Sequence, residues 1–302
     1  MSATKRCVSI ADSVYEMSKL LVYLPVDGGV NRRWGEAIAL HDDCQTEIVL
    51  DLRDAKFVDP MSLIRMRALI DLSSAGGRKV EIVSPRDAAA RSYLEWMHLA
   101  TDLPPSCASD LETIDAPGSS KVLIPVTRLR NPTDVTELER TLEDLYLAHF
   151  EGSLAPLADA FTWTIGEICD NATTHGTSSV GGSYLAAQRY SNKRCIIAIG
   201  DLGIGIAAHM RQVYPDLDDE TAIRLATKGG ESGTGDPQRG FGYQYVIDGI
   251  KNERIQSGEL RVWSGRSRFR LLARGGLQER RRAWAIDKAT NGTWVGVDLV
   301  GQ

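Results

Sequence analysis

The order of helical and extended segments in the second half of the chain constrains its fold most strongly. KVLIPVTRL (121–129) has the composition of a strand, and two amphipathic helices follow over 133–150 and 154–175. Because helices and strands then continue in blocks, we expect an α+β sandwich in which a mixed, mainly antiparallel sheet carries helices on one face. The remaining predicted elements are strands over 182–190 and 194–200, helices within 204–226 and over 242–251, and strands over 259–263, 267–273 and 293–300.

The first half predicts a smaller α/β unit. TEIVLDL and KVEIVSP read as strands, and Asp59 is placed to cap a helix that begins at Pro60. A strand, a helix and a second strand joined by short connections imply a parallel pair. Residues 104–120 are rich in Pro, Ser and acidic side chains, which is typical of a linker. We therefore expect a first domain over 1–110 with its core at about 19–103, a linker over 104–120, and a second domain over 121–302.

Composition argues against several classes of protein. No apolar run approaches the roughly 20 residues that cross a bilayer, and the N-terminal segment lacks the apolar stretch of a signal peptide. The net charge of -5 disfavours a dedicated nucleic-acid binder. The five cysteines are scattered and never spaced as CxxC, so we expect reduced thiols in a cytoplasmic protein rather than disulfides or a zinc site.

Two polar side chains share one face of the helix over 154–175. Glu167 and Asn171 are four residues apart, about 40° in azimuth and about 6 Å along the axis. A carboxylate and an amide oxygen are hard ligands that suit Mg²⁺. Taken alone, the pair is more typical of a solvated helix face.

A strongly apolar run, IIAIG, ends in Asp201, and Gly203 and Gly205 follow. A carboxylate at a strand end can accept a hydrogen bond from an exocyclic amine such as that of adenine. The glycines would let the backbone approach a flat base closely. An Asp-Gly turn that closes the strand would explain Asp201 and Gly203, but not the full Gly-x-Gly run.

Six glycines fall between 229 and 242. Such a segment fits a lid over phosphates, although a bare glycine-rich loop is equally typical of a surface loop. Gly240 and Gly242 lie where the next helix begins, and the free N–H groups there favour anionic oxygens. Lys228 and Arg239 flank the glycines and are placed to neutralise phosphate charge.

Taken together, GEICDNATTHG, GDLGIGI, RGFGYQY and NGTWVGVDLV resemble the motifs of the GHKL (Bergerat-fold) ATPase superfamily, which includes DNA gyrase and the histidine kinases. The resemblance covers about 121–300, and NATTHG followed by DLGIGI is particularly similar to the anti-sigma-factor serine kinases. It implies ATP and Mg²⁺ as cofactors. By motif match, Asn171 ligates the metal beside Glu167, Asp201, Gly203 and Gly205 form the adenine box, Gly240 and Gly242 form the second glycine box, and Thr293 lies near the adenine pocket.

The resemblance leaves the reaction open. Glu167 would act as a base on water, for ATP hydrolysis, or on a partner's serine hydroxyl, for phosphotransfer. A histidine autokinase is disfavoured, because none of the five histidines lies in an HE-x-x-x-P pattern. The alternative from another class is a non-catalytic, nucleotide-gated scaffold for protein binding. The implied signalling partner is a STAS-domain protein or a sigma-factor-type regulator, and a homodimer is allowed.

LDLRDAKFVDPMSLIRM, GGRKVEIVSP and RSYLEWMHL resemble a STAS domain, the fold of anti-sigma-factor antagonists, over about 19–110. Regulated members carry a phosphorylatable serine directly after the aspartate that Asp59 matches. This chain has Pro60 there, and Ser62 follows two residues later. The resemblance therefore implies a docking or scaffolding role, and the alternative is a small α/β unit with no signalling history.

An arginine-rich stretch runs from Arg261 to Arg282. Strand alternation would place many of these side chains on the open face of the sheet. Two interpretations remain: a solvated face balanced by acidic residues, and a surface for an acidic protein partner.

Overall fold

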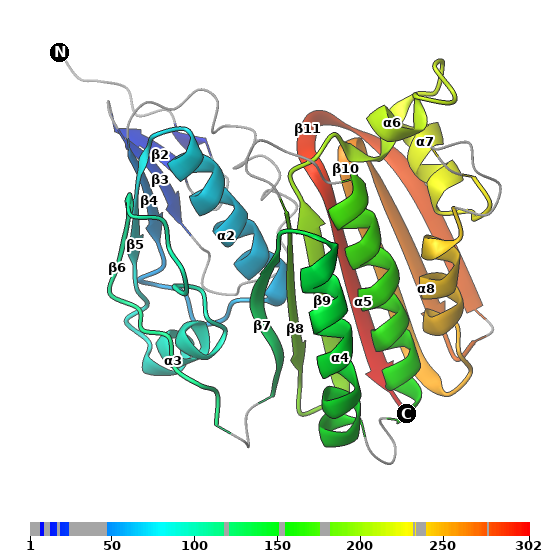
Figure 1. The fold of residues 1–302 in the computed structure, drawn as a ribbon, viewed down its shortest axis with the longest axis horizontal. Helices are drawn as coiled ribbons and strands as arrows, with labels where there is room; N and C mark the ends of the chain where they lie inside the picture. Colours follow the sequence, from blue (N-terminus) through cyan, green and yellow to red (C-terminus); the bar gives the residue numbers. More distant parts are fainter. Residues whose placement is uncertain are drawn as a thin grey trace. The chain divides into compact units, whose positions relative to one another are not determined.

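A computed structural model of the chain describes residues 7–8, 13–16, 19–23, 47–117, 121–150, 155–175, 182–231, 233, 240–276 and 278–302. The chain forms two compact units, Met1–Ser120 and Lys121–Gln302 (Figure 1). Among the helices described in these ranges, none is long and apolar enough to cross a bilayer.

The first unit is built on a six-stranded sheet. Its strands are β1 (Cys7–Val8), β2 (Ser13–Glu16), β3 (Lys19–Tyr23), β4 (Glu47–Asp51), β5 (Lys79–Val83) and β6 (Cys107–Ser109). They lie in sequence order: β1, β2 and β3 pair antiparallel, and β3, β4, β5 and β6 pair parallel. The predicted parallel pair of β4 and β5 is confirmed.

Two helices, α2 (Pro60–Ala75) and α3 (Ala88–Trp96), accompany this sheet. The predicted cap of α2 is confirmed, because the Ser62 N–H donates to Asp59 Oδ1 at 2.8 Å. The prediction of a single buried stripe on α2 is wrong, because charged residues on its other faces are buried as well. Arg67 and Asp71 tolerate burial because they pair at 3.2 Å.

Strand β6 corrects the predicted linker over 104–120. Cys107, Ala108 and Ser109 pair in parallel with Val80–Ile82 of β5, so this part of the segment completes the sheet. A three-residue strand carries no periodic signal of its own, and its formation depends on the neighbouring strand.

The second unit holds a five-stranded sheet in the order β10-β11-β9-β8-β7, antiparallel throughout its described pairs. Helices α4, α5 and α8 lie side by side over one face of this sheet (Figure 1). This arrangement confirms the predicted α+β class. The strands are β7 (Val122–Leu129), β8 (Ser183–Arg189), β9 (Arg194–Asp201), β10 (Ile255–Arg274) and β11 (Gln278–Gly301), and the helices are α4 (Pro132–His149), α5 (Ala155–His175), α6 (Gly205–Met210), α7 (Asp219–Ala226) and α8 (Gly242–Ile250).

The core of the second unit fixes the orientation of α5. The predicted apolar stripe of this helix is buried against the sheet and the neighbouring helices, as confirmed for Leu157, Phe161, Ile165, Ile168 and Ala172. Burial of each large apolar side chain contributes about 1.5–3 kcal/mol. Rotation of α5 would expose this stripe, so the polar residues beside it are held in one direction.

The long hairpin of β10 and β11 differs from the prediction. The predicted strands over 259–263 and 267–273 are one strand, β10, with register shifts on either side of Gly265. Residues 278–292 were not predicted as a strand, yet they belong to β11 and pair with β10 as far as Arg274. Their polar sequence gives no alternating signal, and pairing with β10 determines their conformation.

The arginines of this hairpin are at least partly balanced within the sheet. Glu259 accepts hydrogen bonds from Arg261 at 2.6 and 2.7 Å and also pairs with Arg270, while Arg281 pairs with Glu279. These pairs favour the interpretation of a charge-balanced face.

Candidate functional site

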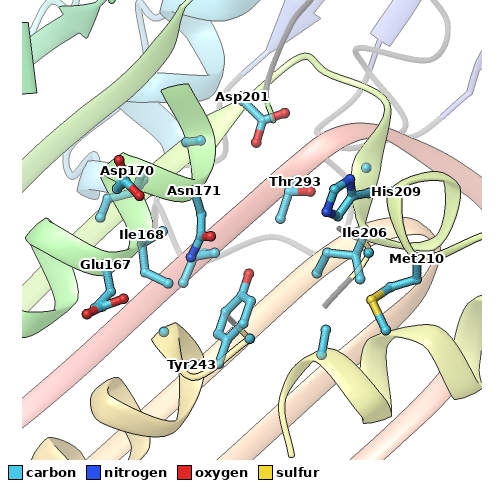
Figure 2. A pocket seen from close by; sticks show the side chains of 18 of the residues that line it. Glu167, Ile168, Asp170, Asn171, Asp201, Ile206, His209, Met210, Tyr243 and Thr293 are labelled. Carbon is cyan, nitrogen blue, oxygen red and sulfur yellow. The ribbon is translucent and has the colours of Figure 1, made fainter. Parts of the chain in front are cut away.

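A cavity of about 380 Å³ lies in the second unit (Figure 2). It is bounded by α5, the end of β9, α6, the start of α8 and β11. Of the residues singled out in the sequence, Glu167, Asn171, Asp201, Gly205, Gly240, Gly242 and Thr293 line it.

Glu167 and Asn171 face the start of α8. A Cβ atom on Gly242 would lie 2.9 Å from both Glu167 Oε2 and Asn171 Nδ2. The helices also approach closely about two turns of α5 earlier, where a Cβ atom on Gly249 would lie 3.2 Å from Ala160 Cβ. Glycine at both positions therefore allows α8 to place its N-terminal backbone against the acid and the amide.

The electrostatic environment of Glu167 favours its protonated form. Partial burial, and secondarily the negative charge of Asp170, raise the pKa of Glu167 above its usual range. Among the residues that the structure describes, no three His, Cys, Asp or Glu side chains gather as a metal site. The arrangement suits an ion such as Mg²⁺, which keeps waters and needs only one or two protein ligands.

Asp201 ends β9 at the wall of the cavity and is only 5% exposed. The Gly203 N–H donates to its Oδ1 at 2.7 Å. Burial raises the pKa of Asp201 to about 7, and the backbone N–H groups of Gly203 and Thr293 offset part of that effect. Gly203 is thus a hydrogen-bond donor to Asp201 and is not among the residues that line the cavity.

The strand junction beside Asp201 depends on Gly292. This residue has a φ of +72°, and a Cβ atom on it would lie 1.8 Å from the Asp201 carbonyl oxygen. No other residue type could bring β11 so close to the end of β9. Gly292 thereby sets the position of Thr293, which pairs directly with Asp201 across the two strands.

We expect Gly292→Ala to destabilise the second unit by about 3 kcal/mol or more, through steric overlap added to the cost of the left-handed backbone. The matched control is Gly275→Ala: its φ is +53° and nothing lies within 4 Å of the added carbon. That variant should cost about 1–2 kcal/mol, from the backbone alone. Differential scanning calorimetry compares them, and equal shifts in melting temperature would contradict the role given to Gly292.

The two ends of the glycine-rich segment meet beside the cavity. The Gly230 N–H donates to the Gly240 carbonyl at 3.1 Å, and a Cβ atom on Gly240 would lie 2.3 Å from the Glu231 carbonyl oxygen. Gly240 has a φ of +92°, which only glycine adopts readily. The segment is therefore pinned at its base, immediately before the free N–H groups of α8.

One predicted phosphate contact, Lys228, is not among the described residues that line this cavity. Lys228 lines a second cavity, together with Arg224, Arg281 and Arg282, and is absent from the lining of the first. Arg239 lies outside the described residues.

Several lining residues had no signal in the sequence. Figure 2 shows Tyr243 of α8 pointing toward Asn171, and Ile206, His209 and Met210 of α6 closing another side. Burial, and secondarily the charge of Asp201, raise the pKa of Tyr243. Apolar side chains at helical spacing are indistinguishable from core residues in a sequence, so only the fold could identify them.

No protein-family model matches this chain, and no curated protein matches it. Among solved structures, the chain is similar to the 43K ATPase domain of Thermus thermophilus gyrase B in complex with an aminocoumarin (13% identity, TM-score 0.30, covering 56% of this chain and 41% of that one). It is also similar to the B-subunit of the DNA gyrase from Myxococcus xanthus (11% identity, TM-score 0.28, covering 55% of this chain and 42% of that one). A third similar structure is the ATPase region of Saccharomyces cerevisiae topoisomerase II (10% identity, TM-score 0.28, covering 47% of this chain and 37% of that one). This chain covers less than half of each of them, and TM-scores this low carry no inference about function.

Proposed function

We propose that the second unit binds Mg-ATP in the cavity between α5, α8, the end of β9 and the part of β11 around Thr293. The observation that carries the proposal is the convergence on one cavity of a paired acid and amide, a buried carboxylate at a strand end, and a glycine-rich helix start. These three groups suit a metal-bound phosphate chain, an exocyclic amine and anionic oxygens, respectively. The cavity volume is also within the range of small-molecule sites.

Each part of the nucleotide has a matching group. Asp201 offers a buried carboxylate that already accepts from backbone N–H groups, that of Gly203 at 2.7 Å among them, and an adenine amine would add a further donor. The close backbone at Gly242 and Gly240 would face the phosphates. Asn171, with Glu167 beside it, would hold Mg²⁺, which neutralises phosphate charge when bound.

Glu167 is the residue we assign to catalysis. Its carboxylate would accept the proton of an attacking oxygen, either from water in ATP hydrolysis or from a serine hydroxyl of a partner protein in phosphotransfer. The raised pKa of Glu167 means that the base form increases with pH through that pKa, so turnover should rise with pH as well. A nucleotide-gated scaffold without turnover is the second candidate, and it is favoured by the glycine-rich segment, whose ends are pinned beside the cavity.

We propose that the first unit is a STAS-like docking module in a cytoplasmic signalling protein. Its parallel strands β3, β4 and β5, with α2 capped by Asp59, support this proposal. Ser62 is 1% exposed, so its hydroxyl is inaccessible to a kinase in this conformation. This burial favours docking over a phosphorylation switch.

Hydrogen–deuterium exchange with and without Mg-ATP tests the proposed site. We expect slower exchange in the segments over 167–171, 201–206, 240–245 and 292–295 together, because one ligand would contact all of them. The segment over 259–263 of β10 should not change. Protection that leaves the cavity segments unaffected would contradict the proposal.

Nucleotide affinity should depend on pH through Asp201. The folded-state pKa of about 7 lies above the ordinary value of 3.8, so burial of this carboxyl is least costly below pH 3.8 and becomes more costly as pH rises toward 7. Only the ionised form is a full acceptor for an amine. Apparent affinity should therefore fall about tenfold between pH 8 and pH 6, with release of a proton on binding near pH 6.

Calorimetric titrations in buffers of different ionisation enthalpy measure the protons released. Adenosine serves as the control ligand, because it has no phosphate groups that titrate. A pH-independent affinity for adenosine would rule out Asp201 as the acceptor.

A further inference from the structure

The solvent side of α5 carries an unusual row of side chains beside the cavity. Asp159, Trp163, Gly166 and Asp170 follow one another at offsets of four, three and four, so they lie on one face of the helix. Trp163 is 48% exposed. Gly166 leaves open space in this row, because the atom nearest to a Cβ added there, Glu139 Oε1, would lie 3.9 Å away.

Helix α8 carries a similar row next to it. Phe241, Tyr245 and Asp248 are all exposed, with Phe241 at 40% and Tyr245 at 51%. The two rows are adjacent, because a Cβ atom on Gly249 of α8 would lie 3.2 Å from Trp163 Cε3. Phe241 and Tyr245 also line the cavity. We call the surface formed by Asp159, Trp163, Asp170, Phe241, Tyr245 and Asp248 the acidic aromatic face.

The charge of this face is one-sided. The chain contains 35 Lys and Arg residues, yet neither α5 nor α8 contains any. Elsewhere in the second unit some carboxylates are paired with arginine, as in Arg194 with Asp298 at 2.6 Å. Within the described part of the chain, Asp159 and Asp170 form no ion pair, and the field of Asp170 reaches Glu167. The two helices therefore contribute negative charge and no positive charge to this face.

Three exposed aromatic rings beside carboxylates define a specific binding chemistry. Exposed large apolar side chains that cluster mark interaction surfaces, and Trp and Tyr supply most of the binding energy in such surfaces. A guanidinium group both stacks on aromatic rings and pairs with carboxylates. An arginine-bearing segment is thus the occupant that complements the shape and the charge of this face.

We propose that the acidic aromatic face binds a basic, arginine-bearing segment of a partner protein and holds it beside Glu167. That this face binds a basic segment does not depend on the proposed function. Only the further role of the partner, as the phosphotransfer substrate whose serine lies near Glu167, rests on it.

Fluorescence anisotropy with a labelled peptide tests this. The probe is a twelve-residue peptide of alternating Arg and Gly with one central Ser, and the comparison peptide has Glu in place of Arg. The double variant Trp163→Ser with Asp159→Asn changes the face at residues that do not line the cavity. The matched control, Phe57→Ser with Asp115→Asn, removes an exposed aromatic ring and an exposed carboxylate from the first unit.

The wild-type protein and the control should bind the Arg peptide at least tenfold more tightly than the Glu peptide. The face variant should lose at least tenfold in Arg-peptide affinity while its Mg-ATP affinity stays at the wild-type level. Equal losses in the face variant and the control would overturn the proposal, as would equal binding of both peptides. Self-association that only the face variant abolishes, measured by light scattering, would overturn it too and assign the face to a second copy of the chain. Because Mg-ATP binding is measured separately in every variant, failure of the nucleotide site is distinguishable from failure of peptide binding at the acidic aromatic face.

Discussion

Replacing Asp201 by asparagine is expected to weaken Mg-ATP binding about 100-fold while the protein stays folded. The asparagine Oδ1 can still accept from the Gly203 N–H, which donates to Asp201 at 2.7 Å in the native chain. The new amide nitrogen would then face the adenine amine, donor against donor. A buried polar mismatch of this kind costs about 3 kcal/mol, which is about two factors of ten in affinity.

The same substitution should not lower stability above pH 7. Asp201 is ionised there and buried, and removal of that charge relieves the cost of its desolvation. Asp159→Asn is the matched control: it makes the same chemical change at an exposed position of α5 and should leave affinity unchanged. Wild-type affinity for Mg-ATP in the folded variant would exclude Asp201 as the base-recognition group. A lowered melting temperature above pH 7 would contradict the cost assigned to burial of its charge.

Replacing Glu167 by glutamine should lower the rate of phosphate release or phosphotransfer about 1,000-fold with little change in Mg-ATP affinity. Glutamine keeps the size of the side chain beside Gly242, where Glu167 Oε2 lies 2.9 Å from the position of a Cβ atom. It cannot accept the proton of an attacking oxygen. Loss of a positioned general base reduces rates by about 10²–10⁴.

Glu137→Gln on the exposed side of α4 is the control for that experiment. Single-turnover assays with labelled ATP, with and without a candidate partner, follow both water and serine as acceptors. If wild type and Glu167→Gln are equally inactive but bind Mg-ATP, the nucleotide-gated scaffold is the correct function. Equal activity in the two proteins would remove Glu167 from the catalytic step.

Strong local periodicity made most of the fold predictable. The apolar stripe of α5 and the run that forms β9 were both predicted, because burial determines their pattern directly. The failures occurred where neighbours decide the structure. Gly265 marks an irregularity within one strand rather than a break between two, and residues 278–292 extend only because β10 pairs with them. The sequence likewise gave no indication that the charged faces of α2 would be buried.

The candidate site was predictable to the extent that backbone geometry restricts residue type. Gly242 and Gly292 lie where a Cβ atom would overlap its surroundings, so their motifs identify positions close to Asn171 and Asp201. Lys228 lines a different cavity from the predicted one, because proximity to glycines in sequence does not specify the direction of a side chain after α7 ends. Tyr243 was missed because a ring that lines a cavity has the same helical spacing as one in the core.

Binding of a magnesium-bound adenine nucleotide by Asn171 and Asp201, beside Glu167, is the proposal on which the other predictions depend. Isothermal titration of the full chain with ATP, in the presence and absence of Mg²⁺, measures this directly. We expect saturable binding at one site per chain, tighter with Mg²⁺ than without, and weakened by Asp201→Asn but not by Asp159→Asn. Absence of saturable binding by the folded wild-type protein in Mg²⁺ would contradict it.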